Sequence, residues 1–345
     1  MFTSKIGADI GFGYGKIAWF DEDSQMHILV IPSVLGRSTQ LAQMDLSLLG
    51  GRKRQRVWRV TYQGEEYLVG SDALLHSQTG VQATQSFERI GSDEERLLLL
   101  AMLAKAGLTD VAIVTGLPVL GWDLRHRLRR SWEGEHQITL GRKEMTINIR
   151  QVRTAWQPVL SLYDHALVFR DGEVKLAPEM DGDLLRRGWL VVDVGHNTTD
   201  RAGLINLTPL EQYSGGSKIG GRNILSVIQA SIEAKYRVHK SLPELERALR
   251  QGQIDLYDER LDLLPLARSA AGSLAAQVAS DVAEGTGDGS QFYGIILTGG
   301  PVDVVRPAIA KAFPRNKLYV LDQLGNARGA VKWAQGPGVF KKLEA

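Results

Sequence analysis

A glycine-rich stretch near the N-terminus places an acid and a base on either side of a turn. Residues 6–20 read IGADIGFGYGKIAWF, with Asp9 before the glycines Gly11, Gly13 and Gly15 and Lys16 after them. Glycines adopt positive φ angles and let backbone amides approach a phosphate closely. A carboxylate can hold hydrated Mg²⁺, and a lysine supplies a point charge to phosphate oxygens. The stretch therefore predicts a phosphate-binding loop.

Spacing separates three designs of such a loop. A Walker A loop needs a glycine at position 10 and Ser or Thr at position 17, but both places hold isoleucine. A Rossmann fingerprint must open a helix, whereas residues 16–20 (KIAWF) have the pattern of a strand. A β-hairpin whose turn offers N–H groups to phosphate fits both flanking runs. For this stretch alone, a plain glycine-rich turn is the competing interpretation.

The same plan occurs a second time. Residues 191–200 read VVDVGHNTTD: an apolar strand, Asp193, Gly195, a polar turn and the start of a second strand. Both copies carry Asp-Ile/Val-Gly directly after a strand. Two such hairpins facing each other across a cleft could hold a polyphosphate from both sides, with their carboxylates on a metal ion. This duplication is the strongest inference that spacing alone supports.

The elements around these hairpins predict an α/β fold with mixed sheets. Ser92 and Glu95 have the Ser-x-x-Glu spacing of a capping box at a helix start, and Gly107 has the type and place of a helix end. Residues 57–70 have the pattern of two strands around a Gln63-Gly64 turn. Further strands are expected at 5–11, 16–20, 26–34, 110–119, 188–195, 200–207 and 293–298. Helices are expected at 92–108, 158–169, 220–238, 265–285 and 325–334. Residues 179–188 mark the expected divide between two halves.

Composition excludes several classes of protein. The chain has 345 residues, 43% of them hydrophobic, which is enough for two domains with their own cores. A net charge of +2 argues against a protein that coats nucleic acid by charge alone, and the absence of cysteine excludes disulfides and thiolate metal sites. No leader and no apolar run long enough for a bilayer is evident. We expect a soluble, cytoplasmic protein without a membrane partner.

Two basic tracts stand out. Residues 125–130 (RHRLRR) fall on a helical pattern, so their arginines are expected on its solvated face. Residues 51–56 (GRKRQR) have a loop-like composition and are a candidate contact site for a partner.

An ordered set of segments resembles the actin/heat-shock chaperone/sugar kinase superfamily, and within it the prokaryotic actin-like ATPases of the plasmid-segregation ParM/StbA type. The segments are DIGFGYGK, VTGLPV, WQPVLSLY, VVDVGHNTTD, GGSKIGG and GIILTGGP, and they span almost the whole chain. The resemblance implies two related lobes, each a mixed β-sheet flanked by helices, with a nucleotide in the cleft between them. Lobe I would be residues 1–185 with an insertion at about 30–105, and lobe II residues 186–345 with an insertion at about 222–285. The C-terminal helix would pack back on lobe I.

The resemblance also implies ATP or ADP with Mg²⁺ between the two hairpins. Asp9 and Asp193 would hold the hydrated metal, with Asp193 also catalytic, and Gln157 would orient the attacking water. Residues implied to bind the nucleotide are Gly11, Phe12, Gly13, Tyr14, Lys16, Gly195, His196, Asn197, Thr198, Gly216, Gly220, Gly299, Gly300 and Pro301. The family usually has Gly-Gly where this chain has His196 and Asn197. Simpler interpretations are a turn residue for His196, a helix-start residue for Gln157 and a core aromatic for Tyr14.

The resemblance implies a filament-forming ATPase that assembles head to tail and segregates plasmid or other DNA through a DNA-binding adaptor, without sequence-specific DNA binding of its own. The loop at 36–56 and the basic tracts are then candidate contacts. A small-molecule kinase is one alternative, but it needs a carboxylate base where this chain has the amide Gln157; the nearest acid, Asp164, lies two helical turns further on. A nucleotide-switched binding module with little catalysis is the other. ATP and GTP are not distinguished.

Overall fold

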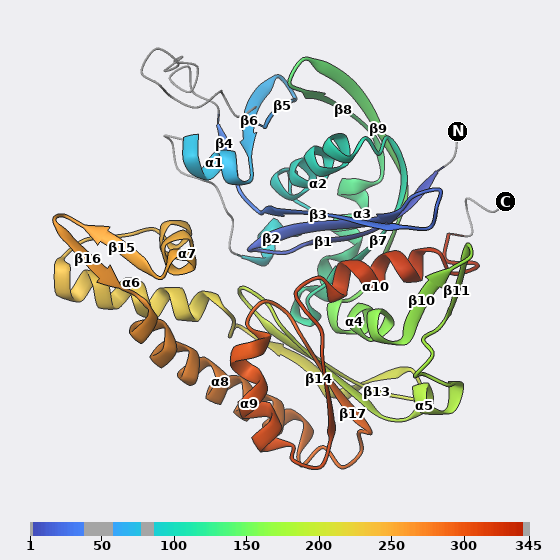
Figure 1. Cartoon of the computed structure of the whole chain (residues 1–345). Coiled ribbons are helices and arrows are strands. Elements are labelled where there is room, and N and C mark those ends of the chain that lie inside the picture. The colour runs from blue at the N-terminus through green and yellow to red at the C-terminus, as the bar shows by residue number, and fades with distance from the viewer. Residues whose placement is uncertain (1–2, 38–57, 77–85, 341–345) are drawn as a thin grey trace.

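The structure is a computed structural model that describes residues 3–37, 58–76 and 86–340 (Figure 1). Its first sheet has the strand order β3-β2-β1-β7-β9-β8-β5-β6-β4. The strands are β1 (Ser4–Ile10), β2 (Tyr14–Phe20), β3 (Met26–Pro32), β4 (Leu35–Arg37), β5 (Arg59–Tyr62), β6 (Glu65–Val69), β7 (Asp110–Leu117), β8 (Gly134–Leu140) and β9 (Lys143–Trp156). The helices of this half are α1 (Ser71–His76), the 3₁₀ turn η3 (Phe87–Arg89), α2 (Asp93–Ala106), the 3₁₀ turn η4 (Val119–Leu124), α3 (Arg125–Trp132) and α4 (Gln157–Ala166).

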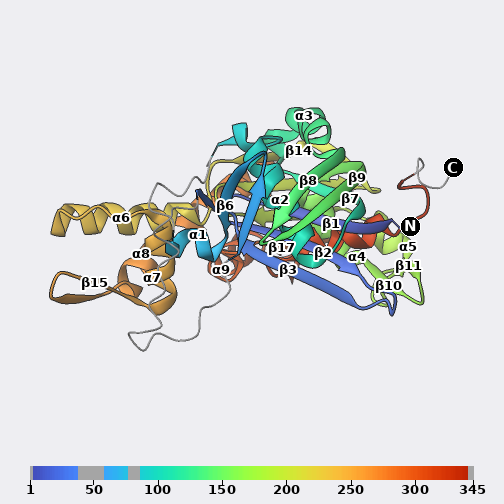
Figure 2. The same cartoon turned by 90° about the horizontal axis from the view of Figure 1, so that it is seen from above.

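The second large sheet has the order β14-β13-β12-β17-β18. Its strands are β12 (Trp189–Val194), β13 (Thr199–Ile205), β14 (Thr208–Ser217), β17 (Gly294–Thr298) and β18 (Lys317–Val320). Two short hairpins stand apart, β10 (Leu167–Arg170) with β11 (Glu173–Leu176) and β15 (Gln253–Leu256) with β16 (Glu259–Asp262). The helices are α5 (Gly182–Arg186), α6 (Arg222–Tyr236), α7 (Leu242–Gln251), α8 (Leu264–Thr286), α9 (Val302–Ala312) and α10 (Gly325–Ala334). In both views α6, α7 and β15 lie together on one side of the molecule (Figures 1 and 2).

The two large sheets share a local plan. In each, an antiparallel three-stranded unit (β3-β2-β1 or β14-β13-β12) continues into a parallel neighbour, β7 or β17. The hairpin β1–β2, called the first hairpin below, and the hairpin β12–β13, the second hairpin, therefore occupy equivalent places. The predicted fold, two related lobes with mixed sheets flanked by helices, is confirmed. The lobe and insertion borders named above stay a prediction.

Most expected elements are present within a few residues, and one helix end was wrong. The helix expected at 158–169 ends at Ala166, because Leu167 turns to an extended backbone and starts β10. Asp171 and Gly172 both have positive φ angles in the tight turn between β10 and β11. An Asp-Gly pair between apolar runs is a strong hairpin signal, and it was missed.

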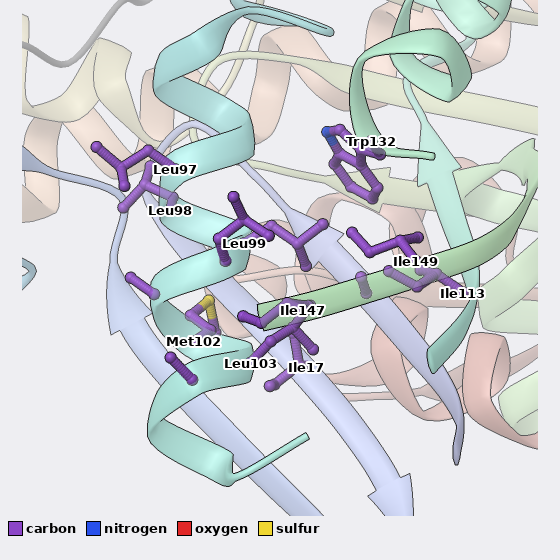
Figure 3. Packing of buried hydrophobic residues seen from close by; sticks show 14 of the residues in the cluster. Ile17, Leu97, Leu98, Leu99, Met102, Leu103, Ile113, Trp132, Ile147 and Ile149 are labelled. Atoms are coloured by element: carbon purple, nitrogen blue, oxygen red, sulfur yellow. The ribbon is translucent and has the colours of Figure 1, made fainter. Parts of the chain in front are cut away.

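Helix α2 forms the centre of the first core. Its residues from Leu97 to Ala104 are all buried, and they pack with side chains of β2, β7 and β9 and with Trp132 of α3 (Figure 3). Ser92 caps the helix, since its hydroxyl accepts from the Glu95 amide, and Gly107 ends it in the left-handed conformation. The Glu95 carboxylate, however, accepts from the Gly91 amide and is buried. Only half of the expected capping box therefore forms.

The C-terminal helix α10 packs against α4 and β1 (Figure 1). Two glycines allow this approach: a Cβ on Gly7 would lie 2.3 Å from the Ala327 carbonyl oxygen, and one on Gly329 would lie 1.7 Å from that of Leu160. Because α4 begins at Gln157 and α10 carries Asn326, this contact also fixes two polar side chains relative to the hairpins.

The basic tract at 125–130 lies on α3, where Leu128 is buried and Arg127 and Arg130 are exposed, as predicted. The tract at 51–56 and most of the loop at 36–56 lie outside the described residues. Among the helices of the described ranges, none is both long and apolar enough to cross a bilayer.

Candidate functional site

The two hairpins meet at one cavity of about 380 Å³. Its lining includes nearly all of the residues predicted to bind nucleotide or metal: Asp9, Gly11, Phe12, Gly13, Tyr14, Lys16, Gln157, Asp193, Gly195, His196, Asn197, Thr198, Gly299, Gly300 and Pro301. Gly216 and Gly220 are outside this lining. A Cβ on Gly220 would lie 2.6 Å from the His196 carbonyl oxygen, so Gly220 packs directly against the second turn. Gly216 lies on β14 beside Leu120.

Asp9 is held by two donors at the end of β1. Lys16, its partner across the first hairpin, donates from Nζ to Oδ2 at 2.8 Å. Gln157 Nε2 donates to Oδ1 at 3.0 Å. Gly116 makes room for this amide, because a Cβ there would lie 2.7 Å from Gln157 Cγ. Gln157, the first residue of α4, thus points at Asp9, the candidate metal ligand at the end of β1.

Asp193 has a different environment at the end of β12. Asn326 Nδ2 donates to its Oδ2 at 2.7 Å, and the Ser161 hydroxyl in turn donates to Asn326 Oδ1 at 2.7 Å. Burial raises the pKa of Asp193 to about 6 against the effect of the Asn326 hydrogen bond, and the charge of Asp9 raises it further. A cation shared by the two carboxyl groups would relieve this effect of Asp9 on Asp193. Sequence reasoning missed Asn326, whose only signal is a polar residue in a helix of small ones.

Asp200 faces Asp193 across the second hairpin, where the first hairpin has Lys16. The Thr198 hydroxyl donates to its Oδ2 at 2.8 Å and the Val119 amide to its Oδ1 at 2.7 Å. Burial raises the pKa of Asp200 to about 7, opposed by the Thr198 bond and assisted by Asp193. This acid lines the cavity and joins the second hairpin to the turn after β7, yet it was not among the predicted site residues.

His196 lies between the two turns. A Cβ on Gly13 would be only 3.1 Å from His196 Cγ, so the glycine leaves space for the imidazole. Desolvation lowers the pKa of His196 to about 4, with Arg222 contributing, and the ring is therefore neutral at pH 7. The carbonyls of Gly195 and His196 accept from the amides of Gly221 and Arg222. The start of α6 thus holds the second turn in place.

On the other side of the cavity, Tyr14 contacts α7. Its hydroxyl donates to Glu246 Oε1 at 2.9 Å, and the Arg250 guanidinium lies 5.2 Å from the ring centroid. Arg250 Nη2 also donates to Glu246 at 3.0 Å. Tyr14 is half-buried at the cavity, so the interpretation as a plain core aromatic does not describe it. Ile224, Leu225 and Leu249 give this end an apolar wall suited to a planar ring.

The donor set fits magnesium held partly by water. Among the described residues, no group of three or more His, Cys, Asp or Glu side chains could hold a metal ion. Mg²⁺, however, keeps several waters and is usually bound by one or two carboxylates together with substrate phosphates. Asp9 and Asp193 line the same cavity with fixed carboxylates. They supply such a pair.

Comparison with known proteins agrees with this architecture. A family model described as the actin like proteins N terminal domain matches residues 7–159, and one described as the archaeal actin homologue MreB-like C-terminal domain matches residues 191–311. None of the curated proteins matches.

Solved structures are similar over nearly their whole length. Ta0583, an archaeal actin homologue, is 17% identical with a TM-score of 0.76, over 96% of this chain and 99% of that one. A second structure of Ta0583, in complex with ADP, is 16% identical with a TM-score of 0.74 over the same shares. ParM in a 15-stranded filament from Clostridium botulinum is 19% identical with a TM-score of 0.75, over 97% and 99%. With actin-like models matching both of its halves, this chain belongs to the actin-like protein family.

Proposed function

We propose that the protein is a Mg²⁺-dependent ATPase that binds ATP in this cavity, polymerises head to tail and hydrolyses the nucleotide to ADP and phosphate. One observation carries the proposal: Asp9, Gln157 and Asp193, which come from three separate elements, line a single cavity between two equivalent hairpins. The ADP complex of Ta0583 supports a nucleotide as the ligand.

The chemistry assigned to these residues is positioning and electrostatic stabilisation. The turns of the two hairpins offer backbone N–H groups to the phosphates, and bound Mg²⁺ would offset their charge. Gln157 orients the attacking water through its amide; it is a poor proton acceptor. The nitrogen of that amide donates to Asp9, so its oxygen is the atom left to accept a bond from water. The apolar wall of α6 and α7 would receive the base.

The cellular task that we propose is segregation of plasmid or other DNA in the cytoplasm, through a DNA-binding adaptor and not through direct sequence-specific contact. The similarity to the ParM filament from Clostridium botulinum supports self-association as a filament. A heterologous contact between copies gives an open helix and not a closed ring.

A small-molecule kinase on the same fold is less well supported. Asp164, the acid nearest to Gln157 in sequence, forms ion pairs with Arg328 and Lys332, both at 2.7 Å. It is not among the residues that line the cavity. The observation that would favour a kinase, a carboxylate base beside Gln157 on α4, is therefore lacking in the described part of the chain.

Light scattering after addition of ATP and Mg²⁺, with phosphate release recorded in parallel, tests the proposal. We expect scattering to rise and phosphate to follow, and the Asp193→Ala variant to release none while it still binds some ATP. Nucleotide binding and assembly without hydrolysis would instead indicate the switched binding module. Phosphate transfer to a small molecule without assembly would indicate the kinase.

A further inference from the structure

Arg89, at the end of η3, is a buried cation at the edge of the cavity. Its side chain is 2% exposed, and it lines the cavity together with Gly11, Glu95 and Gln157. Arginine is rarely buried without a partner, because the charge loses its hydration. Burial lowers the pKa of Arg89, yet a guanidinium stays protonated at pH 7.

One edge of this guanidinium has no partner. Nη1 donates to the Gly11 carbonyl oxygen of the first turn at 3.2 Å. Nε and Nη2 have no hydrogen-bond partner in the described part of the chain. Nε and Nη2 are the two parallel donors of the fork that bind carboxylate or phosphate in a bidentate manner. Arg150 uses the same pair of atoms to bind Asp110, at 2.7 and 2.6 Å.

No described carboxylate compensates the charge by a direct ion pair. Glu95 is the strongest electrostatic neighbour of Arg89, but its carboxylate accepts from the Gly91 amide at 2.7 Å instead. Burial raises the pKa of Glu95 to about 7 in spite of Arg89, so Glu95 is only partly ionised at neutral pH. Lys16, a cation of the first hairpin that also lines the cavity, is already paired with Asp9. Arg89 is thus a buried cation of this cavity with donors to spare.

We propose that Arg89 binds the terminal phosphate of the nucleotide through Nε and Nη2, after a shift of the side chain that uncovers these two buried atoms, and links the phosphate to the first turn through Gly11. This proposal rests on the proposed nucleotide-binding function and goes beyond it, because it assigns the distinction between triphosphate and diphosphate to one residue of η3. When the terminal phosphate leaves, Arg89 loses the negative charge that it had paired with. Because Arg89 donates to Gly11, the first turn then changes its position.

Binding measurements test the proposal without relying on turnover. Dissociation constants are measured by titration calorimetry for a non-hydrolysable ATP analogue and for ADP, both with Mg²⁺, on the parent, Arg89→Met and Arg89→Lys. We expect Arg89→Met to weaken binding of the analogue at least tenfold and binding of ADP less than threefold. Arg89→Lys keeps the charge but loses the pair of parallel donors. Its affinity for the analogue should therefore lie between that of the parent and that of Arg89→Met. Arg150→Met is the matched control, because it removes a guanidinium whose Nε and Nη2 bind a carboxylate outside the cavity. It should change neither dissociation constant.

Stability separates binding from folding. Because Arg89→Met removes an uncompensated buried charge, its thermal midpoint without nucleotide should equal or exceed that of the parent. If Arg89→Met does not fold, Arg89→Lys provides the test. Its dissociation constant for the analogue should then rise more than its dissociation constant for ADP. Equal losses for analogue and ADP, or no loss, would overturn the proposal while the proposed function stands. A parent that binds neither nucleotide would instead refute the proposed function, and this proposal with it.

Discussion

At the scale of single residues, each candidate catalytic side chain is positioned by a neighbour from a distant part of the chain. Gln157 contacts Asp9, which is 148 positions away, and Asn326 contacts Asp193 across 133 positions. Such contacts fix the donor and acceptor atoms before a ligand arrives, which is how positioning lowers an activation barrier.

Gln157→Ala should lower kcat for ATP hydrolysis by roughly 10²-fold, in the range found when a positioning group is removed. The KM for ATP should change little, because in the proposed function the two hairpins, and not Gln157, hold the phosphates. Phosphate release at saturating ATP is the measurement, and Gln253→Ala, an exposed glutamine on β15, is the control. Turnover equal to that of the parent would contradict the water-orienting role.

Glu95 makes stability depend on pH. Its pKa is about 7 in the folded protein, against an ordinary value of 4.5, so the folded state binds more protons than the unfolded state between these values. Stability contributed by the neutral carboxyl is therefore complete below about pH 4.5 and declines as the pH rises towards 7, by roughly 3 kcal/mol in total. Glu95→Gln should remove this decline.

The measurement is the free energy of unfolding by urea at about pH 5 and pH 8, for the parent and Glu95→Gln. The other buried groups, such as Asp200 and His196, titrate alike in both proteins. The difference in unfolding free energy between the parent and Glu95→Gln therefore changes with pH only because of Glu95. A difference that does not change between the two pH values would refute the assignment.

At the scale of elements, the close contact of α10 with α4 and β1 determines where Asn326 and Gln157 lie. Only glycine lets these backbones approach as they do at Gly7 and Gly329. The site therefore depends on a helix–helix contact whose closest approach, at Gly329, lies outside the cavity lining.

Gly329→Ala should destabilise the protein by about 3 kcal/mol or more, because its methyl group would overlap the Leu160 carbonyl and force the helices apart. Gly272→Ala is the matched control: this glycine lies inside α8, and a Cβ there would point into open space. There, alanine should stabilise the helix by about 0.5–1 kcal/mol. Urea unfolding of both variants checks the opposite signs, and equal effects would contradict the packing argument.

At the scale of the whole molecule, the cavity lies between two halves that also contact each other directly. The hydrogen bond from Tyr14 on the first hairpin to Glu246 on α7 joins them at the end of the cavity that has the apolar wall. If the proposed nucleotide exchanges through an opening between the two halves, this bond must break.

Tyr14→Phe should therefore speed nucleotide dissociation by about tenfold, since a hydrogen bond to a carboxylate contributes about 1.5 kcal/mol. Stopped-flow displacement of a fluorescent nucleotide gives the rate. Tyr257→Phe, which alters a tyrosine that is 85% exposed, should leave it unchanged. Slower release from Tyr14→Phe would show that the bond does not hold the cleft closed.

Much of the fold could be predicted from the sequence because its signals are local. The periodicity of apolar residues, the Ser92 and Gly107 caps and the two Asp-x-Gly turns depend on neighbours only a few positions apart. The repetition of one hairpin plan, at Asp9 and Asp193, predicted two turns that face one cleft. The ordered set of six segments carried the resemblance to the family and to its two lobes. The prediction went wrong at Leu167, where a local signal, the Asp171-Gly172 turn, was passed over.

The two hairpins, about half of the described strands and helices, and the residue types of the candidate phosphate site could thus be predicted from local sequence signals. The tertiary structure was needed to show that Asn326 donates to Asp193, that Glu95 accepts from the Gly91 amide and not from its capping position, and that Arg89 reaches Gly11. The difference arises from how far apart in the sequence the interacting residues lie. Backbone hydrogen bonding and side-chain periodicity act over a few residues, whereas burial and the pairing of charges depend on which distant elements pack together.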